Sequence, residues 1–219
     1  MDYEGFVKFF SLTGRLKDIA RMGWVMRGVR NAESVGDHSF RTALMALILA
    51  PEFPEINAEK AVKLALIHDV CEVYTKDIAT RPKEDLQIVS NEKKHELEMK
   101  AVETLSAFLP NFQAKELLDL YKECEEKKSA EAKFVKQIEV IETALQAADY
   151  ERQGRNKESL EELFVNARNK VSDPKLKKLL DNIEEWRKQK STETKTDVER
   201  EIDFLFKQIK RKEKKGWKE

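Results

Sequence analysis

The 219-residue sequence has few residues that break helices, with only 7 glycines and 5 prolines over its whole length. Turn signals are therefore sparse, and no alternation of apolar and polar residues, as in strands, extends over a useful length. Long helices joined by short breaks are the predicted architecture, and the predicted fold class is all-α.

Cysteines and long apolar runs are scarce as well. Cys71 and Cys124 are the two cysteines and form no CxxC pair, which argues against a disulfide framework and a cysteine-based zinc site. The neighbours of Cys71 predict a buried, reduced residue. The longest apolar stretch, 43–51, is far too short to cross a bilayer, and the first residues lack the pattern of a signal peptide. We expect a cytoplasmic protein that does not bind membranes.

The chain also lacks an excess of charge of either sign. Lys and Arg total 41, Asp and Glu also total 41, and the formal net charge is zero. Nucleic-acid binding usually needs a basic surplus on one face, so no nucleic-acid partner is expected.

Apolar spacing predicts a series of helices followed by a polar hinge and a basic amphipathic segment. Asp37 and Asn57 are the expected N-caps of the second and third helices. Residues 1–186 are predicted to form one domain and 187–219 a basic helical C-terminal extension. The predicted helices span 3–20, 38–50, 58–74, 91–108, 114–127, 130–152, 157–171 and 174–190, and the buried stripe expected for 38–50 comprises Phe40, Ala43, Leu44, Leu47 and Ile48.

The chain has only three histidines, and two of them fall in strongly apolar helices. His68 and Asp69 are adjacent in the most apolar helix, where an ionisable pair is costly unless something such as a bound cation compensates for it. His38, next to Asp37, begins another apolar helix. A packed, hydrogen-bonded His-Asp pair is the alternative, but two histidines on two core helices, each beside an acid, favour one divalent cation. His95 lies on a charged face and is expected to be solvated.

The run RMGWVMRGVRNAESVGDHS at 21–39, HDVCE at 68–72 and TKD at 75–77 resemble the HD-domain phosphohydrolases. The resemblance is to the 5'-deoxynucleotidase branch, which includes the HD domain-containing 2 proteins, and it covers residues 5–150. It implies an HD-type helical bundle, one divalent metal, and removal of the 5'-phosphate from deoxyribonucleoside monophosphates. A homodimer through the later helices is predicted from apolar surface after residue 150, and the resemblance supports it.

In the family that the chain resembles, a first His, the His-Asp doublet and a distal Asp hold the metal. Carried over, the metal ligands are His38, His68, Asp69 and Glu139. The family usually has Asp at the place of Glu139, and Glu moves the carboxylate outward by roughly one carbon–carbon bond. Direct ligation is predicted; ligation through water, weaker affinity or a different metal preference are the alternatives. Imidazole and carboxylate ligands suit Mn, Co, Zn, Fe, Ni or Mg.

Two acidic residues are expected to take part in catalysis. Glu72 lies one turn after His68 and is the predicted proton donor or acceptor, with a helix-surface glutamate as the alternative. The resemblance places Asp77 at the cavity mouth, in contact with substrate or water. The expected chemistry is phosphate-ester hydrolysis by water that the cation activates.

Substrate-binding residues are expected in the loop before His38. Arg21 and Arg27 are predicted to bind phosphate, and Trp24 to line the substrate pocket, where its ring can stack on base or sugar. Glu33 is a candidate brace for an arginine or for His38. The alternative for Arg21, Arg27 and Glu33 is a solvated loop residue without a function. The alternative for Trp24 is an aromatic residue of the core.

Two other functions stay open at this point. The first is an HD-type hydrolase of another nucleotide or phosphate ester. The second is a non-catalytic, metal-containing helical binding protein, which the replacement at Glu139 favours.

Overall fold

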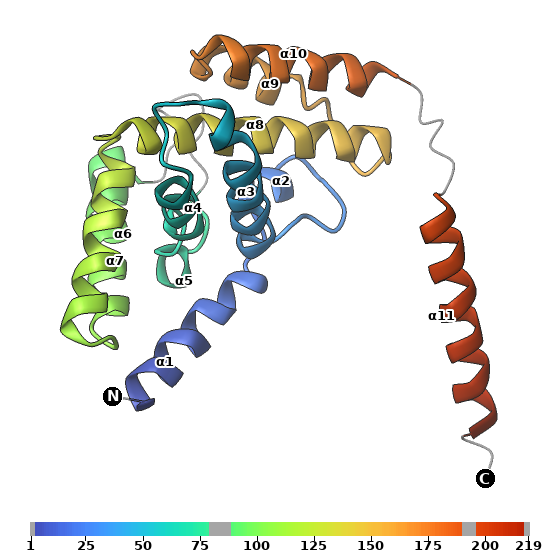
Figure 1. Cartoon of the computed structure of the whole chain (residues 1–219), viewed down its shortest axis with the longest axis horizontal. Helices are drawn as coiled ribbons and strands as arrows, with labels where there is room; N and C mark the ends of the chain where they lie inside the picture. Colours follow the sequence, from blue (N-terminus) through green and yellow to red (C-terminus); the bar gives the residue numbers. More distant parts are fainter. Residues whose placement is uncertain (1–2, 79–88, 190–195, 217–219) are drawn as a thin grey trace. The chain divides into compact units, whose positions relative to one another are not determined.

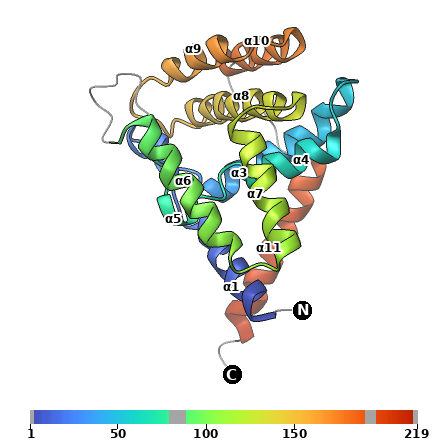
Figure 2. The ribbon, with the colours of Figure 1, turned by 90° about the vertical axis from the view of Figure 1, so that its left-hand side faces the viewer.

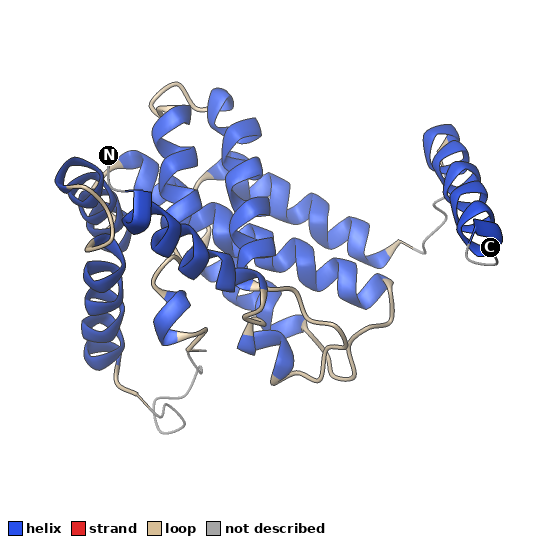
Figure 3. Ribbon diagram, turned by 90° about the horizontal axis from the view of Figure 1, so that it is seen from below, coloured by secondary structure: helices blue, strands red, loops and turns tan. Residues whose placement is uncertain are grey.

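A computed structural model describes residues 3–78, 89–189 and 196–216. Within these ranges every regular element is a helix, and the one β interaction is an isolated bridge between Ala20 and Ser34 (Figure 3). The predicted all-α class is confirmed. The chain divides into two compact units, Met1–Lys188 and Gln189–Glu219, which are described separately.

The first unit holds ten α-helices and two short 3₁₀ helices within the described residues. They are α1 (Tyr3–Thr13), η1 (Gly14–Lys17), α2 (Met22–Val25), α3 (Val35–Leu49), η2 (Ala50–Glu52), α4 (Ala58–Ile67), α5 (Glu72–Thr75), α6 (Asn91–Ser106), α7 (Asn111–Glu125), α8 (Ala130–Arg152), α9 (Glu161–Lys170) and α10 (Pro174–Lys188).

Helix α8 is the centre of the first unit. Figure 1 shows α9 and α10 along one side of α8, with α3 and α4 packed on the other. Figure 2 gives the same arrangement from the side, with α6 and α7 next to each other. Because α8 contacts both layers, most of its circumference is buried, including Phe134, Ile138 and Ile141. One side of α8 can therefore present the predicted ligand Glu139 towards α3 and α4, while its other side packs on α9 and α10.

The start of α3 differs from the sequence prediction. The N-cap is Ser34, not Asp37: its hydroxyl accepts a hydrogen bond from the Asp37 amide, and the Asp37 carboxylate accepts one from the Ser34 amide. This reciprocal pair is a capping box, in which Asp takes the position usually held by Glu or Gln. The helix therefore begins three residues earlier than predicted, and His38 lies within its second turn.

The predicted buried stripe of α3 is also wrong. Of its five residues only Ala43 is buried, whereas the four larger side chains are 44–67% exposed. The buried side of α3 is instead made of small and polar residues, because it faces α8 and the functional cavity at close range. The exposed apolar residues are Phe40, Leu44, Leu47 and Ile48.

Helix α4 ends earlier than its apolar pattern predicts. Asn57 caps it as expected, by accepting a hydrogen bond from the Lys60 amide at 3.0 Å. The helix stops at Ile67, and a turn containing His68 and Asp69 leads to the short α5. The doublet is therefore presented by a break in the helix.

The apolar residues after position 150 are used inside the first unit. Leu160, Phe164, Leu176, Leu180 and Ile183 are buried against α8 and against each other. The surface on which a dimer through the later helices was predicted is thus largely covered. Large exposed apolar side chains lie instead on α3 and on α1, where Tyr3, Val7 and Phe10 are 65–71% exposed.

The second unit contains α11 (Asp197–Gly216). Among the described residues, no helix combines the length and the apolar character needed to span a bilayer.

Candidate metal centre

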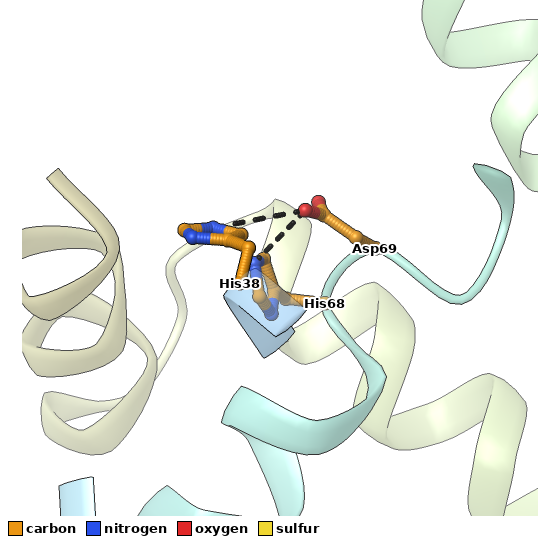
Figure 4. Close-up of side chains that lie close together, drawn as sticks. All are labelled: His38, His68 and Asp69. Carbon is orange, nitrogen blue, oxygen red and sulfur yellow. Dashed lines mark ion pairs between the residues drawn. The ribbon is translucent and has the colours of Figure 1, made fainter. Parts of the chain in front are cut away.

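Three separate segments bring the predicted ligands to one cavity of about 870 Å³. His38 comes from α3, His68 and Asp69 from the turn after α4, and Glu139 from α8. The first three offer ligand atoms that all lie within 4.8 Å of one another. Figure 4 shows both imidazole rings directed at the carboxylate of Asp69.

The distances within this cluster are short but leave room for an ion. Asp69 Oδ2 lies 3.1 Å from His68 Nε2 and 3.8 Å from His38 Nε2. The two rings meet edge to face, with centroids 5.2 Å apart. Three ligand atoms from two histidines and one carboxylate match the donor set of borderline divalent ions.

Hydrogen bonds fix which nitrogen of each ring faces the cavity. His68 Nδ1 donates to the Ala65 carbonyl oxygen at 2.7 Å, and His38 Nδ1 contacts the Glu142 carboxylate. Both Nε2 atoms are left for the cavity. His68 Nε2 is buried, lies 3.1 Å from Asp69 Oδ2, and has no hydrogen-bond partner among the described residues. A cation bound between these groups would satisfy the nitrogen and the carboxylate together, so the residues present fit a metal site.

Glu139 lies at the edge of the cluster. Its Oε2 is 4.0 Å from His68 Nε2 and 3.3 Å from Lys136 Nζ, and it is also buried without a hydrogen-bond partner among the described residues. Burial alone would raise the pKa of Glu139, but the charge of Lys136 and that of His68 outweigh it and lower the pKa. The carboxylate is thus ionised and lies near the cluster. It does not belong to the close group of His38, His68 and Asp69, and it also forms an ion pair with Lys136.

Asp69 carries a negative charge in spite of its burial. Burial opposes ionisation, yet the facing rings of His68 and His38 lower the pKa of Asp69 well below its ordinary value.

Glu142 is a central residue that sequence reasoning missed. Its fully buried carboxylate contacts His38 Nδ1, receives a hydrogen bond from Arg41 Nε at 2.8 Å, and lies 3.6 Å from Arg21 Nη1. Burial would raise the pKa of Glu142, but His38, Arg21 and Arg41 together lower it to about 2. A signal existed in the sequence, because Glu142 follows Glu139 by three residues and so shares its face of α8.

Arg21 and Trp24 line the cavity and are held by one carboxylate. Glu33 accepts hydrogen bonds from Arg21 Nη1 at 2.8 Å and from the Trp24 indole nitrogen at 2.9 Å. Trp24 is 2% exposed and meets Tyr150 edge to face, so its ring is held in the core and only part of it reaches the cavity. Arg21 Nη2 donates to Thr143 Oγ1 at 3.2 Å.

Arg27 and Asp77 lie on the cavity wall with partners of their own. Arg27 Nε donates to Glu162 on α9 at 2.6 Å, and its Nη1 donates to the Gly23 carbonyl oxygen. Asp77 Oδ2 accepts a hydrogen bond of 2.6 Å from the Met22 amide, which ties the segment after α5 to the start of α2. Both residues therefore help to join the segments that surround the cavity.

Glu72 lies at the start of α5 and is buried. Its Oε2 has no hydrogen-bond partner among the described residues, although it lines the cavity. Burial, with a further contribution from the charges of Asp69 and Asp77, raises the pKa of Glu72 to about 10. The carboxyl group is thus protonated at neutral pH, and a cation close by would lower that pKa.

Helices α6 and α9 complete the wall with residues that the sequence did not single out. They are Lys94 on α6 and Glu162, Leu163, Asn166 and Lys170 on α9. Helix α9 comes almost a hundred residues after His68, and no motif marks it. The other predictions for single residues outside the site hold: His95 is exposed, and Cys71 is a buried free thiol.

The HD domain family matches residues 13–184 of this sequence. The chain belongs to the HD domain family. Relatives of this HD domain include the 5'-deoxynucleotidase HDDC2 of Bos taurus, 39% identical over 81% of the chain and 83% of the relative. The human 5'-deoxynucleotidase HDDC2 is 36% identical over 81% of the chain and 84% of the relative. A conserved hypothetical protein from Pyrococcus furiosus has a similar structure, with a TM-score of 0.65, 32% identity, and coverage of 84% of this chain and 99% of that one.

The buried charge of Glu142 predicts a pH-dependent contribution to the stability of this HD domain. Because its pKa in the folded state is lowered from an ordinary 4.5 to about 2, the contribution is fully present above pH 4.5 and is lost as the pH falls towards 2. The difference in unfolding free energy between the wild type and Glu142→Gln should therefore shrink by about 2 kcal/mol between pH 6 and pH 3.

Urea unfolding of the protein in chelator, followed by circular dichroism, measures this difference. Glu103→Gln, at an exposed position, is the matched control and should show no such change. A difference for Glu142→Gln that does not vary with pH would contradict the assignment.

Proposed function

We propose that this HD domain is a metal-dependent phosphohydrolase that removes the 5'-phosphate from deoxyribonucleoside 5'-monophosphates. The observation that carries the proposal is the convergence of the His38 and His68 Nε2 atoms on the Asp69 carboxylate inside a cavity large enough for a nucleotide. The two relatives named above, described as 5'-deoxynucleotidases, support the reaction and the substrate class.

In this proposal His38, His68 and Asp69 bind one divalent cation, and Glu139 is the fourth protein ligand. When bound, a divalent cation would lower the pKa of a water molecule and neutralise negative charge on the phosphoryl oxygens. The Glu142 carboxylate and the Ala65 carbonyl oxygen orient the two imidazoles, as the partners of metal-bound histidines usually do.

The phosphate is held by Arg21, whose guanidinium Glu33 and Thr143 fix at the cavity wall. Burial would lower the pKa of Arg21, but Glu142 and Glu33 raise it, so the group stays charged. Arg27, held by Glu162, is the second proposed phosphate or sugar contact. Trp24 shapes the wall of the pocket, because its buried indole is bonded to Glu33.

Glu72 and Asp77 are the two acidic residues proposed to take part in catalysis. Burial raises the pKa of Glu72, and its Oε2, which has no hydrogen-bond partner among the described residues, lies on the cavity. Both features suit this carboxyl group to donate a proton to the 5'-oxygen as it leaves. Asp77 closes the cavity beside α2 and is the proposed contact for the attacking water or the sugar.

Replacing His68 tests the function directly. His68→Ala should abolish bound metal and lower kcat/KM for deoxyribonucleoside monophosphates by at least about 10³-fold, since an activated water is lost. His95→Ala is the matched control, because this histidine is exposed and does not line the cavity. The measurements are metal content and phosphate release with Mn, Co, Zn or Mg, over a panel of deoxyribo- and ribonucleotides.

If the protein hydrolyses only a phosphate ester other than deoxyribonucleoside monophosphates, the proposed substrate class is wrong, but the proposed hydrolase activity stands. Bound metal without turnover of any ester would favour a non-catalytic binding protein.

Glu139 provides a second test, because its side chain can be shortened to that of the usual family residue. Glu139→Ala should weaken metal binding about 10- to 100-fold if the carboxylate is a ligand or orients one. Glu139→Asp should retain binding within a few-fold. Competition with a chromogenic chelator measures the affinity. Unchanged affinity in Glu139→Ala would remove this residue from the ligand set.

We also propose a homodimer, formed through the exposed face of α3. Its four large apolar residues are in contact with solvent along one side of a helix, and contiguous patches of this kind mark interaction sites. Helices α9 and α10 are disfavoured as the dimer interface, since most of their apolar residues are buried within the chain. A cytoplasmic location stays a prediction.

A charge on this face should weaken the association of the subunits. Ile48→Glu is expected to lower the fraction of the chain that sediments at twice 25.5 kDa, compared with the wild type at the same concentration, because the carboxylate cannot be buried without a partner. Val165→Glu, at a 44% exposed position on α9, should leave the dimer intact. Dimers of undiminished stability in Ile48→Glu would place the contact elsewhere.

A further inference from the structure

Helix α11 is a feature that the proposed function does not use. It is 20 residues long, belongs to the second unit, and follows the residues that match the HD domain family. Nothing in the metal centre requires it. Its amphipathic pattern therefore needs a separate explanation.

One side of α11 is apolar and exposed. Val198, Ile202 and Leu205 are 69%, 45% and 47% exposed, at spacings of four and three residues. In the sequence Ile209 continues this pattern at the next spacing of four. Alternating spacings of three and four are those of a helix that packs along another helix.

The charges of α11 are separated along its length. Residues 197–203 contain four acids and one arginine, whereas residues 207–215 contain six bases and one acid. A helix with one acidic and one basic half is complementary to a second copy of itself only when the two run in opposite directions. The acids are Asp197, Glu199, Glu201 and Asp203, and the bases are Lys207, Lys210, Arg211, Lys212, Lys214 and Lys215.

We propose that α11 pairs with α11 of a second copy of this chain, in an antiparallel arrangement. The four positions of this side, 198, 202, 205 and 209, are symmetric about the point between residues 203 and 204, so Ile202 faces Leu205 of the other copy and position 198 faces position 209. The exposed Phe204 and Phe206 lie outside this row. The acidic half of each helix then lies against the basic half of its partner. A parallel pair has the same apolar contacts but places like charges together, which is unfavourable.

An anionic lipid surface is the competing occupant. A helix that binds such a surface has basic residues along its whole polar side. The N-terminal half of α11 has the opposite sign and would be repelled by anionic headgroups. The second copy is therefore the partner that the charge pattern favours.

Disulfide trapping in the full chain tests both pairing and direction, because a disulfide forms only between Cα atoms closer than about 7 Å. Ile202→Cys and Leu205→Cys are prepared as separate variants with different affinity tags, mixed and oxidised. The expected product is the mixed 202–205 dimer, at least fivefold over either self-linked product. Lys207→Cys, on the opposite side of the helix, is the control and should give none. The native thiols do not compete, because both are buried, and burial raises the pKa of Cys124 to about 12.

Charge reversal provides the second measurement. Glu201→Lys should lower the yield of the mixed dimer at least threefold at low salt, and the difference from the unreversed pair should shrink at high salt, which screens the charges. Self-linked Ile202→Cys as the main product would show a parallel pair and overturn the proposal. Absence of any cross-link, with or without binding to phosphatidylserine vesicles in co-sedimentation, would overturn it as well.

Discussion

The buried carboxylate of Glu142 is the interaction on which the candidate site depends. It contacts the His38 ring and the guanidinium groups of Arg21 and Arg41, which come from two parts of the chain before it, helix α3 and the residue that precedes α2. A fully buried anion is stable only when its partners remain in place. The charge of Glu142 therefore orients a proposed metal ligand and anchors the proposed phosphate-binding arginine with one group. This anchor lies on α8, which has more buried residues than any other described helix.

The sequence singled out three residues that the structure brings together, His38, His68 and Asp69, because the adjacent His68 and Asp69 are visible without any structure. An ionisable pair in an apolar helix needs compensation, and the structure places His38 beside that pair. Helix α8 was predicted with its observed bounds, because its apolar residues keep helical spacing between 130 and 152. Glu142 was missed because a glutamate in a charged helix gives no direct sign of its burial, and its place on the same face of α8 as Glu139 was the only signal. Its environment is decided by α3, which is a hundred residues away.

The errors have a common physical origin. Apolar periodicity shows which side of a helix avoids water, but it does not distinguish the interior from a surface that another chain covers. On α3 the large residues Phe40 and Ile48 are outside, and the inner side is filled by Ala43 and His38. After residue 150, Phe164 and Leu180 belong to the apolar surface from which a contact with a second chain was predicted, and the structure buries them in the core of this one.

Helix α3 has a further consequence because its two sides have different roles. His38 is on the inner side, and the apolar residues proposed to meet a second subunit are on the outer side. A contact that steadies this helix also steadies one proposed ligand of the cation, so association and metal uptake should strengthen each other by the same factor. The activity per molecule would then increase with enzyme concentration until the subunits are fully paired, and dilute assays would underestimate it.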